Sequence, residues 1–177
     1  ITRRDHFDDV KTGIEAALKL KLNPVKINVV VIKGFNDNEI DDFVELSRRK
    51  NLHIRFIEYM PLGSDISEEK FYSSEKIKEY ISEKFNLYSA EIEGSGPARY
   101  YKVEGAKGSI GFISAISDNF CANCNRLRLT ADGKIKPCLG NNIEVKIADR
   151  MSEDDIVNAY KKAVELKPAS HSLNFNH

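Results

Sequence analysis

Val25-Lys-Ile-Asn-Val-Val-Val-Ile32 is the stretch that decides the fold of this chain. β-Branched residues pack well on a pleated sheet, and a near-continuous apolar run is typical of a parallel strand covered on both faces. Asn23-Pro24 stands before the run and Gly34 follows it, and both interrupt regular structure. The sequence therefore predicts a buried parallel strand over residues 25–32.

Helices and a second strand are expected around this run. Amphipathic spacing and a further apolar run predict elements over residues 5–21 (helix), 39–50 (helix), 53–59 (strand) and 73–84 (helix). Asn36 with Glu39 resembles a capping box for the second helix, and Ser73 or Ser74 is expected to cap the third. Alternation of helices and strands at this spacing predicts a parallel α/β layer.

Beyond residue 86 the pattern changes to short strands separated by glycines. The expected strands cover residues 87–92, 99–103, 108–116, 127–130 and 135–137. Ala131-Asp132-Gly133 is a tight-turn signal between the last two strands. Ser152 with Asp155 predicts a capping box for a final helix over residues 153–166. We expect a small antiparallel sheet here, with a boundary near residue 86.

Composition limits the class of protein. The chain has 177 residues, of which 41% are apolar and 31% charged, so it can bury a core without disulfides. Its formal net charge of zero argues against a general nucleic-acid binder. Because we find neither a run of membrane length nor a signal peptide, we expect a cytoplasmic protein without membrane partners. The chain opens without methionine, so we expect a fragment of a longer protein.

Cys121, Cys124 and Cys138 are the only cysteines, and thirteen residues separate the last two. Three thiolates at this spacing can hold a metal centre and leave one coordination position open for water or substrate. A clustered, odd number of cysteines indicates a metal site in a reducing cytoplasm rather than a disulfide framework. A closed zinc site is the alternative, but it needs a fourth ligand, and all four histidines lie far away in sequence.

Arg126 and Arg128 directly follow the C-x-x-C turn. If Leu127 and Leu129 face a core, the two arginines share the opposite face of the strand. A solvated strand face would explain them without a ligand. However, residues 99–138 contain seven Lys or Arg and three acidic residues, although the chain is neutral. Because a guanidinium binds phosphate oxygens in bidentate fashion, we expect a phosphorylated substrate beside the metal position.

Polar residues also interrupt the first two strands. Lys26 opens one face of the first strand, where a solvent-facing strand end is the simpler interpretation. Arg55 lies within an apolar strand and needs a partner, which is either Glu58 or a bound anion. Met60 ends that strand and serves either as core filler or as a ligand contact. Ligands of α/β folds bind at the carboxyl ends of parallel strands.

Four stretches resemble, in order, the GTP 3′,8-cyclase family of radical S-adenosylmethionine enzymes, which act in molybdenum cofactor synthesis. They are residues 25–28, 55–61, 94–101 and 119–139. The last stretch is the most specific, because Asn-Arg-Leu-Arg-Leu-Thr accompanies the cysteines. The resemblance implies the C-terminal half of the enzyme: the end of an incomplete TIM-like (βα) barrel in residues 1–85, followed by a small antiparallel α+β cluster-binding cap in residues 86–177.

The resemblance also implies roles for single residues. The three cysteines would hold a second [4Fe–4S] cluster, whose open iron would contact the guanine of GTP. The residues matched to the GTP site are Lys26, Arg55, Arg126 and Arg128. Met60 matches a position that contacts S-adenosylmethionine.

The implied reaction of the full-length enzyme is a lyase reaction. A first cluster cleaves S-adenosylmethionine, and the resulting 5′-deoxyadenosyl radical starts the cyclisation of GTP to (8S)-3′,8-cyclo-7,8-dihydroguanosine 5′-triphosphate. That first cluster needs a C-x-x-x-C-x-x-C loop, which this sequence lacks, so no catalytic residue is assigned and the fragment alone is expected to be inactive. The full-length parent would be compatible with a homodimer. The alternatives are a zinc-ribbon-like interaction module without catalysis and the auxiliary-cluster half of a peptide-modifying radical enzyme.

Overall fold

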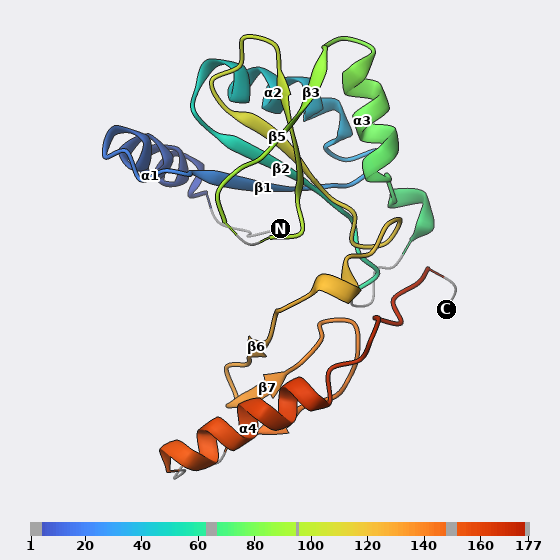
Figure 1. Ribbon diagram of the computed structural model, residues 1–177. Coiled ribbons are helices and arrows are strands. Elements are labelled where there is room, and N and C mark those ends of the chain that lie inside the picture. Colours follow the sequence, from blue (N-terminus) through green and yellow to red (C-terminus); the bar gives the residue numbers. More distant parts are fainter. Residues whose placement is uncertain (1–4, 63–66, 95, 148–151, 176–177) are drawn as a thin grey trace. The chain divides into compact units, whose positions relative to one another are not determined.

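The computed structural model describes residues 5–62, 67–94, 96–147 and 152–175 (Figure 1). The chain divides into two compact units, each of which is described by itself. The first comprises Ile1–Tyr59 and Glu69–Ser114, and the second comprises Met60–Glu68 and Ala115–His177. No helix in the described part of the chain is long and apolar enough to cross a membrane.

A five-stranded sheet forms the first unit, in the order β1-β2-β5-β4-β3. β1, β2 and β5 are parallel neighbours, whereas β4 is antiparallel to both β5 and β3. The strands are β1 (Lys26–Val31), β2 (His53–Glu58), β3 (Leu87–Ala90), β4 (Arg99–Val103) and β5 (Ser109–Ile113). The parallel layer expected from the first 85 residues is thus confirmed, and β5 extends it.

Three α-helices accompany this sheet. They are α1 (Phe7–Lys19), α2 (Ile40–Arg49) and α3 (Ser74–Ser82), with short 3-10 turns η1 (Asp37–Glu39) and η2 (Glu68–Lys70). Ser73 caps α3, because its side chain accepts a hydrogen bond from the Lys76 amide at 3.3 Å. This satisfies one of the amides that the first turn of a helix leaves without a partner.

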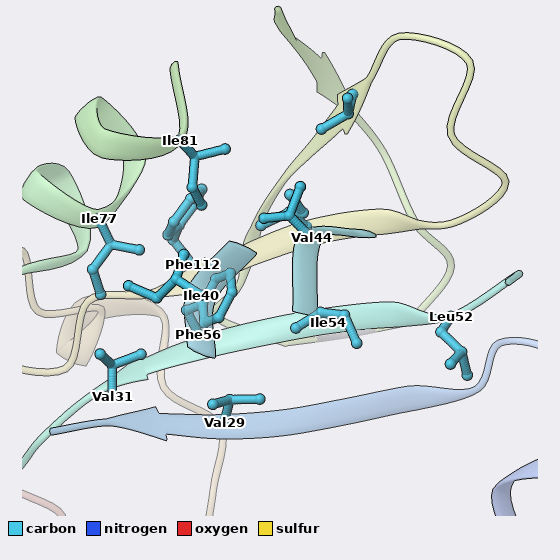
Figure 2. Packing of buried hydrophobic residues seen from close by; sticks show 12 residues of the cluster. Val29, Val31, Ile40, Val44, Leu52, Ile54, Phe56, Ile77, Ile81 and Phe112 are labelled. Atoms are coloured by element: carbon cyan, nitrogen blue, oxygen red, sulfur yellow. The ribbon is translucent and has the colours of Figure 1, made fainter. Parts of the chain in front are cut away.

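The core of the first unit lies on one face of the sheet, under α2 and α3 (Figure 2). Val29, Phe56 and Phe112 occupy one row across β1, β2 and β5, since the strand register aligns them. Ile40 of α2 and Ile77 of α3 meet this face and are almost fully buried. Each such side chain stabilises the fold by about 1.5–3 kcal/mol, which favours a single register.

Among its described residues, the second unit contains a three-stranded antiparallel sheet and one α-helix. Its elements are η3 (Cys121–Asn123), β6 (Arg128–Leu129), β7 (Lys134–Lys136), β8 (Val145–Lys146) and α4 (Glu153–Glu165). Gly133, with φ +73°, provides the predicted turn between β6 and β7. Ser152 and Asp155 form the predicted capping box of α4. Ile135 and Val145 pack against Ala159 and Ala163 of α4 to form a small core.

Three expectations from the sequence are wrong. β1 is not covered on both faces, because it is an edge strand and Val30 is 44% exposed. The short strands after residue 86 do not form one antiparallel sheet, because β3, β4 and β5 join β1 and β2. Asn36 does not cap the second helix: its side chain accepts from the Ile32 amide and donates to the Val30 carbonyl.

The division into units also differs from the boundary near residue 86. Strands β3 to β5 complete the sheet of the first unit, so the change to the second unit follows Ser114. Sequence periodicity found the strands but carries no information on which distant strand each one pairs with. The assignment of residues 1–85 to a barrel and residues 86–177 to a cap stays a prediction.

Candidate functional site

The C-x-x-C turn is built by a short 3-10 helix. The Asn123 amide donates to the Phe120 carbonyl and the Cys124 amide donates to the Cys121 carbonyl, both at 3.1 Å. The chain then leaves the turn in an extended conformation at Cys124. Cys121 and Cys124 are free thiols, and both residues are half-buried.

Cys138 lies just beyond the end of β7, after the fully buried Pro137. It is also free and half-buried, and its Sγ accepts a hydrogen bond from the Gly140 amide at 3.4 Å. A side chain at residue 140 would clash, since a Cβ there would lie 2.7 Å from the Cβ of His171. Close packing therefore requires glycine at residue 140, and the amide hydrogen bond to the sulfur favours a thiolate ligand at Cys138.

The three thiols fit an iron–sulfur cluster in the type of donor that they offer. All are free and partly accessible, and one already receives an amide hydrogen bond, which is a usual means of tuning cluster thiolates. In residues 5–62, 67–94, 96–147 and 152–175, no three His, Cys, Asp or Glu side chains are grouped to hold a single metal ion. In a cluster each thiolate binds its own iron, so its ligands are not gathered around one ion.

Arg126 and Arg128 are both exposed beside the C-x-x-C turn. Arg128 belongs to β6 and pairs with Lys136 of β7, so a second cation lies opposite it on the neighbouring strand. Leu127 packs against the small core, as expected, but Leu129 is 61% exposed and does not face a core. The structure thus presents two guanidinium groups to solvent next to the cysteines.

Lys26 and Arg55 lie on one face of the five-stranded sheet, opposite the apolar core. The register pairs Lys26 with His53 and Asn28 with Arg55, so these four side chains form a polar, basic patch across β1 and β2. The Lys26 Nζ donates to the Glu93 carbonyl at 2.7 Å. The structure therefore brings together two of the residues predicted to bind GTP.

Arg55 is half-buried. The Arg55 Nε is buried and has no hydrogen-bond partner among the described residues. Gly111 lies beside it in β5, and a Cβ there would meet the Tyr100 ring at 2.9 Å and the Arg55 Cγ at 3.3 Å. Because a buried donor without a partner is costly, this atom fits a missing anionic ligand.

Glu58 does not serve as the partner of Arg55. Strand alternation places Glu58 on the core face with Phe56, and its Oε1 accepts a hydrogen bond from the Ser74 amide at 2.8 Å. This buried carboxylate therefore binds the first turn of α3, where the helix dipole favours negative charge. The structural explanation that the sequence offered for Arg55 is thus excluded.

His53 is a member of the patch that sequence reasoning did not identify. It is buried, and its Nδ1 is hydrogen bonded to the Ser109 Oγ at 2.8 Å. Burial is the main cause that lowers the pKa of His53, and the charges of Lys26 and Lys102 lower this pKa further. His53 and Arg55 are two residues apart in a strand, and side chains at this spacing lie on the same face of a sheet. This spacing was the sequence signal that could have identified His53.

Met60 lies two residues after the end of β2 and is half-buried. Its carbonyl accepts a hydrogen bond from the Leu62 amide at 2.8 Å.

The cysteines with Arg126 and Arg128 belong to the second unit, whereas Lys26 and Arg55 belong to the first. The described residues thus form two groups, each with its own candidate role.

This fold and these groups define a mixed α/β protein with a candidate metal centre and a basic sheet face. The chain belongs to the Molybdenum Cofactor Synthesis C family, whose model matches residues 52–173. It is 49% identical over 181 residues to the GTP 3′,8-cyclase of Petrotoga mobilis, covering 99% of this chain and 56% of the relative. It is 46% identical to the GTP 3′,8-cyclase of Syntrophomonas wolfei, covering 98% of this chain and 56% of the relative.

The chain therefore spans little more than half the length of the curated relatives that it matches. The resemblance seen in the sequence, to the C-terminal half of a GTP 3′,8-cyclase, is confirmed.

Proposed function

We propose that this chain is the part of a GTP 3′,8-cyclase that holds GTP and a second [4Fe–4S] cluster for molybdenum cofactor synthesis. The observation that carries the proposal is the set of three free, half-buried cysteines next to two exposed arginines. A thiolate site beside guanidinium groups suits a substrate that combines a metal-binding base with phosphates.

Cys121, Cys124 and Cys138 would hold the cluster, which when bound supplies an open iron position for the guanine. Arg128 from the exposed strand β6, and Arg126 from the segment just before it, would neutralise and orient phosphate oxygens. These residues would raise the rate by fixing the substrate in a reactive geometry rather than by transferring protons. No residue of the chain is proposed to start the radical reaction.

Lys26 and Arg55 would provide further cationic contacts to GTP from the sheet of the first unit. The buried Arg55 Nε, which lacks a partner in the described part of the chain, supports this role. Met60 would contact S-adenosylmethionine, since it follows β2 at the carboxyl end of a parallel strand. The three parallel strands with helices on one face support the proposal that this unit belongs to an incomplete barrel.

Anaerobic reconstitution of the purified chain with iron and sulfide tests the proposal. We expect a brown protein with bound iron and sulfide whose visible and electron paramagnetic resonance spectra change when GTP is added. The Cys138→Ser variant is the matched control and is expected to retain much less iron. Stoichiometric zinc without any effect of GTP would instead favour a zinc-ribbon-like interaction module and would contradict the proposal.

A further inference from the structure

Lys167 connects the two chain segments that carry the cysteines. It follows α4, and its Nζ donates to the Arg126 carbonyl at 2.8 Å and to the Pro137 carbonyl at 2.7 Å. Arg126 is the second residue after Cys124, and Pro137 directly precedes Cys138. One ammonium group therefore holds both segments next to the residues that would bind the cluster.

The Lys167 contact lies just beyond the end of the β6–β7 hairpin. The last β6–β7 pair on this side is Arg128 with Lys136. Arg126 lies two residues before β6 begins, and Pro137 directly follows the end of β7. The two carbonyl groups thus lie just past the end of the ladder, where the cysteine segments begin, and the Lys167 ammonium donates to both of them.

The segment after Lys167 makes further contacts with the Cys138 loop. The Ser172 Oγ donates to the Gly140 carbonyl at 3.1 Å, and the Gly140 amide donates to the Cys138 Sγ. His171 donates from Nε2 to the Ala115 carbonyl at 2.7 Å and accepts the Leu173 amide at Nδ1. The whole segment thus holds the loop that carries the third cysteine, and Lys167 is its only charged contact to both cysteine segments among the described residues.

We infer that Lys167 is a positioning residue for the three-cysteine site: its ammonium fixes the separation of the segment after Cys124 from the segment before Cys138. This inference rests on the proposed function, in which the three cysteines bind an iron–sulfur cluster. The ammonium acts through the two backbone carbonyl groups to which it donates. Outer contacts of this kind change metal affinity by about 10–100-fold when they are removed.

The test compares the variants Lys167→Met, Lys167→Gln and Lys167→Arg in the full 177-residue chain. Lys162→Met, an exposed lysine of α4, is the control for loss of one positive charge. After anaerobic reconstitution, iron and sulfide are measured against a series of chelator concentrations. We expect Lys167→Met to lose iron at about 10–100-fold lower chelator concentration than the wild type. Lys167→Gln should lose iron at a chelator concentration between these two values. Lys167→Arg can donate to both carbonyl groups and should therefore retain iron as the wild type does.

The spectrum of the reduced cluster separates positioning from general stability. We expect the electron paramagnetic resonance signal of Lys167→Met to broaden or shift, while Lys167→Arg and Lys162→Met match the wild type. Equal iron retention and identical spectra in Lys167→Met and the wild type would overturn the inference and leave the proposed function intact. If the wild type itself takes up no iron, the proposed function fails.

A measurement on the metal-free chain tests the inference independently of the cluster. Alkylation of the three thiols is followed by mass spectrometry, together with hydrogen exchange of the Gly140 amide. Lys167→Met is expected to accelerate both the alkylation of the thiols and the exchange of the Gly140 amide hydrogen. Lys167→Arg is expected to restore the slow rates of the wild type. Rates that are the same in Lys167→Met and Lys162→Met would show that Lys167 does not hold these segments.

Discussion

Arg55 illustrates at the scale of one residue how a charge inside an apolar strand can be assigned a role. A structural ion pair would have explained it, but Glu58 faces the opposite side of the sheet and binds the first turn of α3. What remains is a half-buried guanidinium with one buried nitrogen lacking a partner among the described residues. Such an atom destabilises the free protein and would gain a hydrogen bond on binding an anion, which supports the proposal that Arg55 contacts GTP.

Replacement of Arg55 by methionine should separate binding from stability. We expect Arg55→Met to leave the free energy of unfolding unchanged or slightly raised, because it removes a buried donor without a partner. GTP affinity should fall by about 10–100-fold, since a hydrogen bond to a charged group contributes about 1.5–3 kcal/mol. Urea denaturation and titration calorimetry measure the two effects. Arg49→Met, an exposed arginine of α2, is the control; a large loss of stability in Arg55→Met alone would assign a structural role.

His53 should make stability depend on pH between neutral and mildly acidic solution. Its pKa in the fold is lowered below the ordinary value of 6.5, chiefly by burial and then by Lys26 and Lys102. The unfolded chain therefore binds the proton more readily than the folded chain does. Stability is fully present above pH 6.5 and falls as the pH decreases from 6.5 through the lowered pKa of the folded state.

Urea midpoints at pH 7.5 and pH 5.5 check this expectation. The wild type should have the lower midpoint at pH 5.5, and His53→Gln should show a smaller difference between the two values. His6→Gln, which changes an exposed histidine of the same unit, should behave like the wild type. A His53→Gln variant with an undiminished pH dependence would contradict the assignment to His53.

At the scale of elements, the α4 capping box is a local signal that the structure confirms fully. The Ser152 side chain accepts the Asp155 amide, and the Asp155 carboxylate accepts the Ser152 amide at 3.1 Å. The similar pattern at Asn36 failed, because the asparagine side chain instead bonds to the backbone at the end of β1. An asparagine side chain readily forms hydrogen bonds with any nearby backbone amide or carbonyl group. Whether it caps a helix therefore depends on which backbone groups lie within its reach, and residue spacing alone does not show this.

Ser152→Ala should therefore destabilise the second unit. We expect a loss of about 1 kcal/mol in its free energy of unfolding, which is the usual effect of removing an N-cap. The Ser152 hydroxyl is the main cause that lowers the pKa of Asp155, and the backbone amide of residue 152 lowers it further, so loss of the hydroxyl should move this pKa part of the way back toward the ordinary value of 3.8. Thermal denaturation followed by circular dichroism and carboxyl titration by NMR measure these effects. Ser82→Ala, a serine at the end of α3, is the comparison, and an equal effect of both changes would exclude the cap.

At the scale of the whole molecule, local patterns predicted most elements but not their pairing. The apolar run of β1 and the turn at Gly133 are short-range signals, and the structure places a strand and a hairpin there. That β5 lies beside β2 depends on contacts between residues more than fifty positions apart, which no local pattern encodes. The cysteines and arginines were visible as a motif, whereas Lys167 was not, because a lone lysine after a helix has no signature until its contacts are known.

The last prediction concerns the chain as a whole: alone, it should not cyclise GTP. All three of its cysteines lie within one motif, so none remains to hold a further cluster for the cleavage of S-adenosylmethionine. After reconstitution and measurement of bound iron, the chain is incubated anaerobically with GTP, S-adenosylmethionine and reductant. Chromatography should detect neither 5′-deoxyadenosine nor cyclised nucleotide above a sample without protein. The iron measurement is the control that separates a missing cluster from missing chemistry. Cyclised product that increases with the amount of chain would refute the prediction and would require these cysteines to serve the radical step.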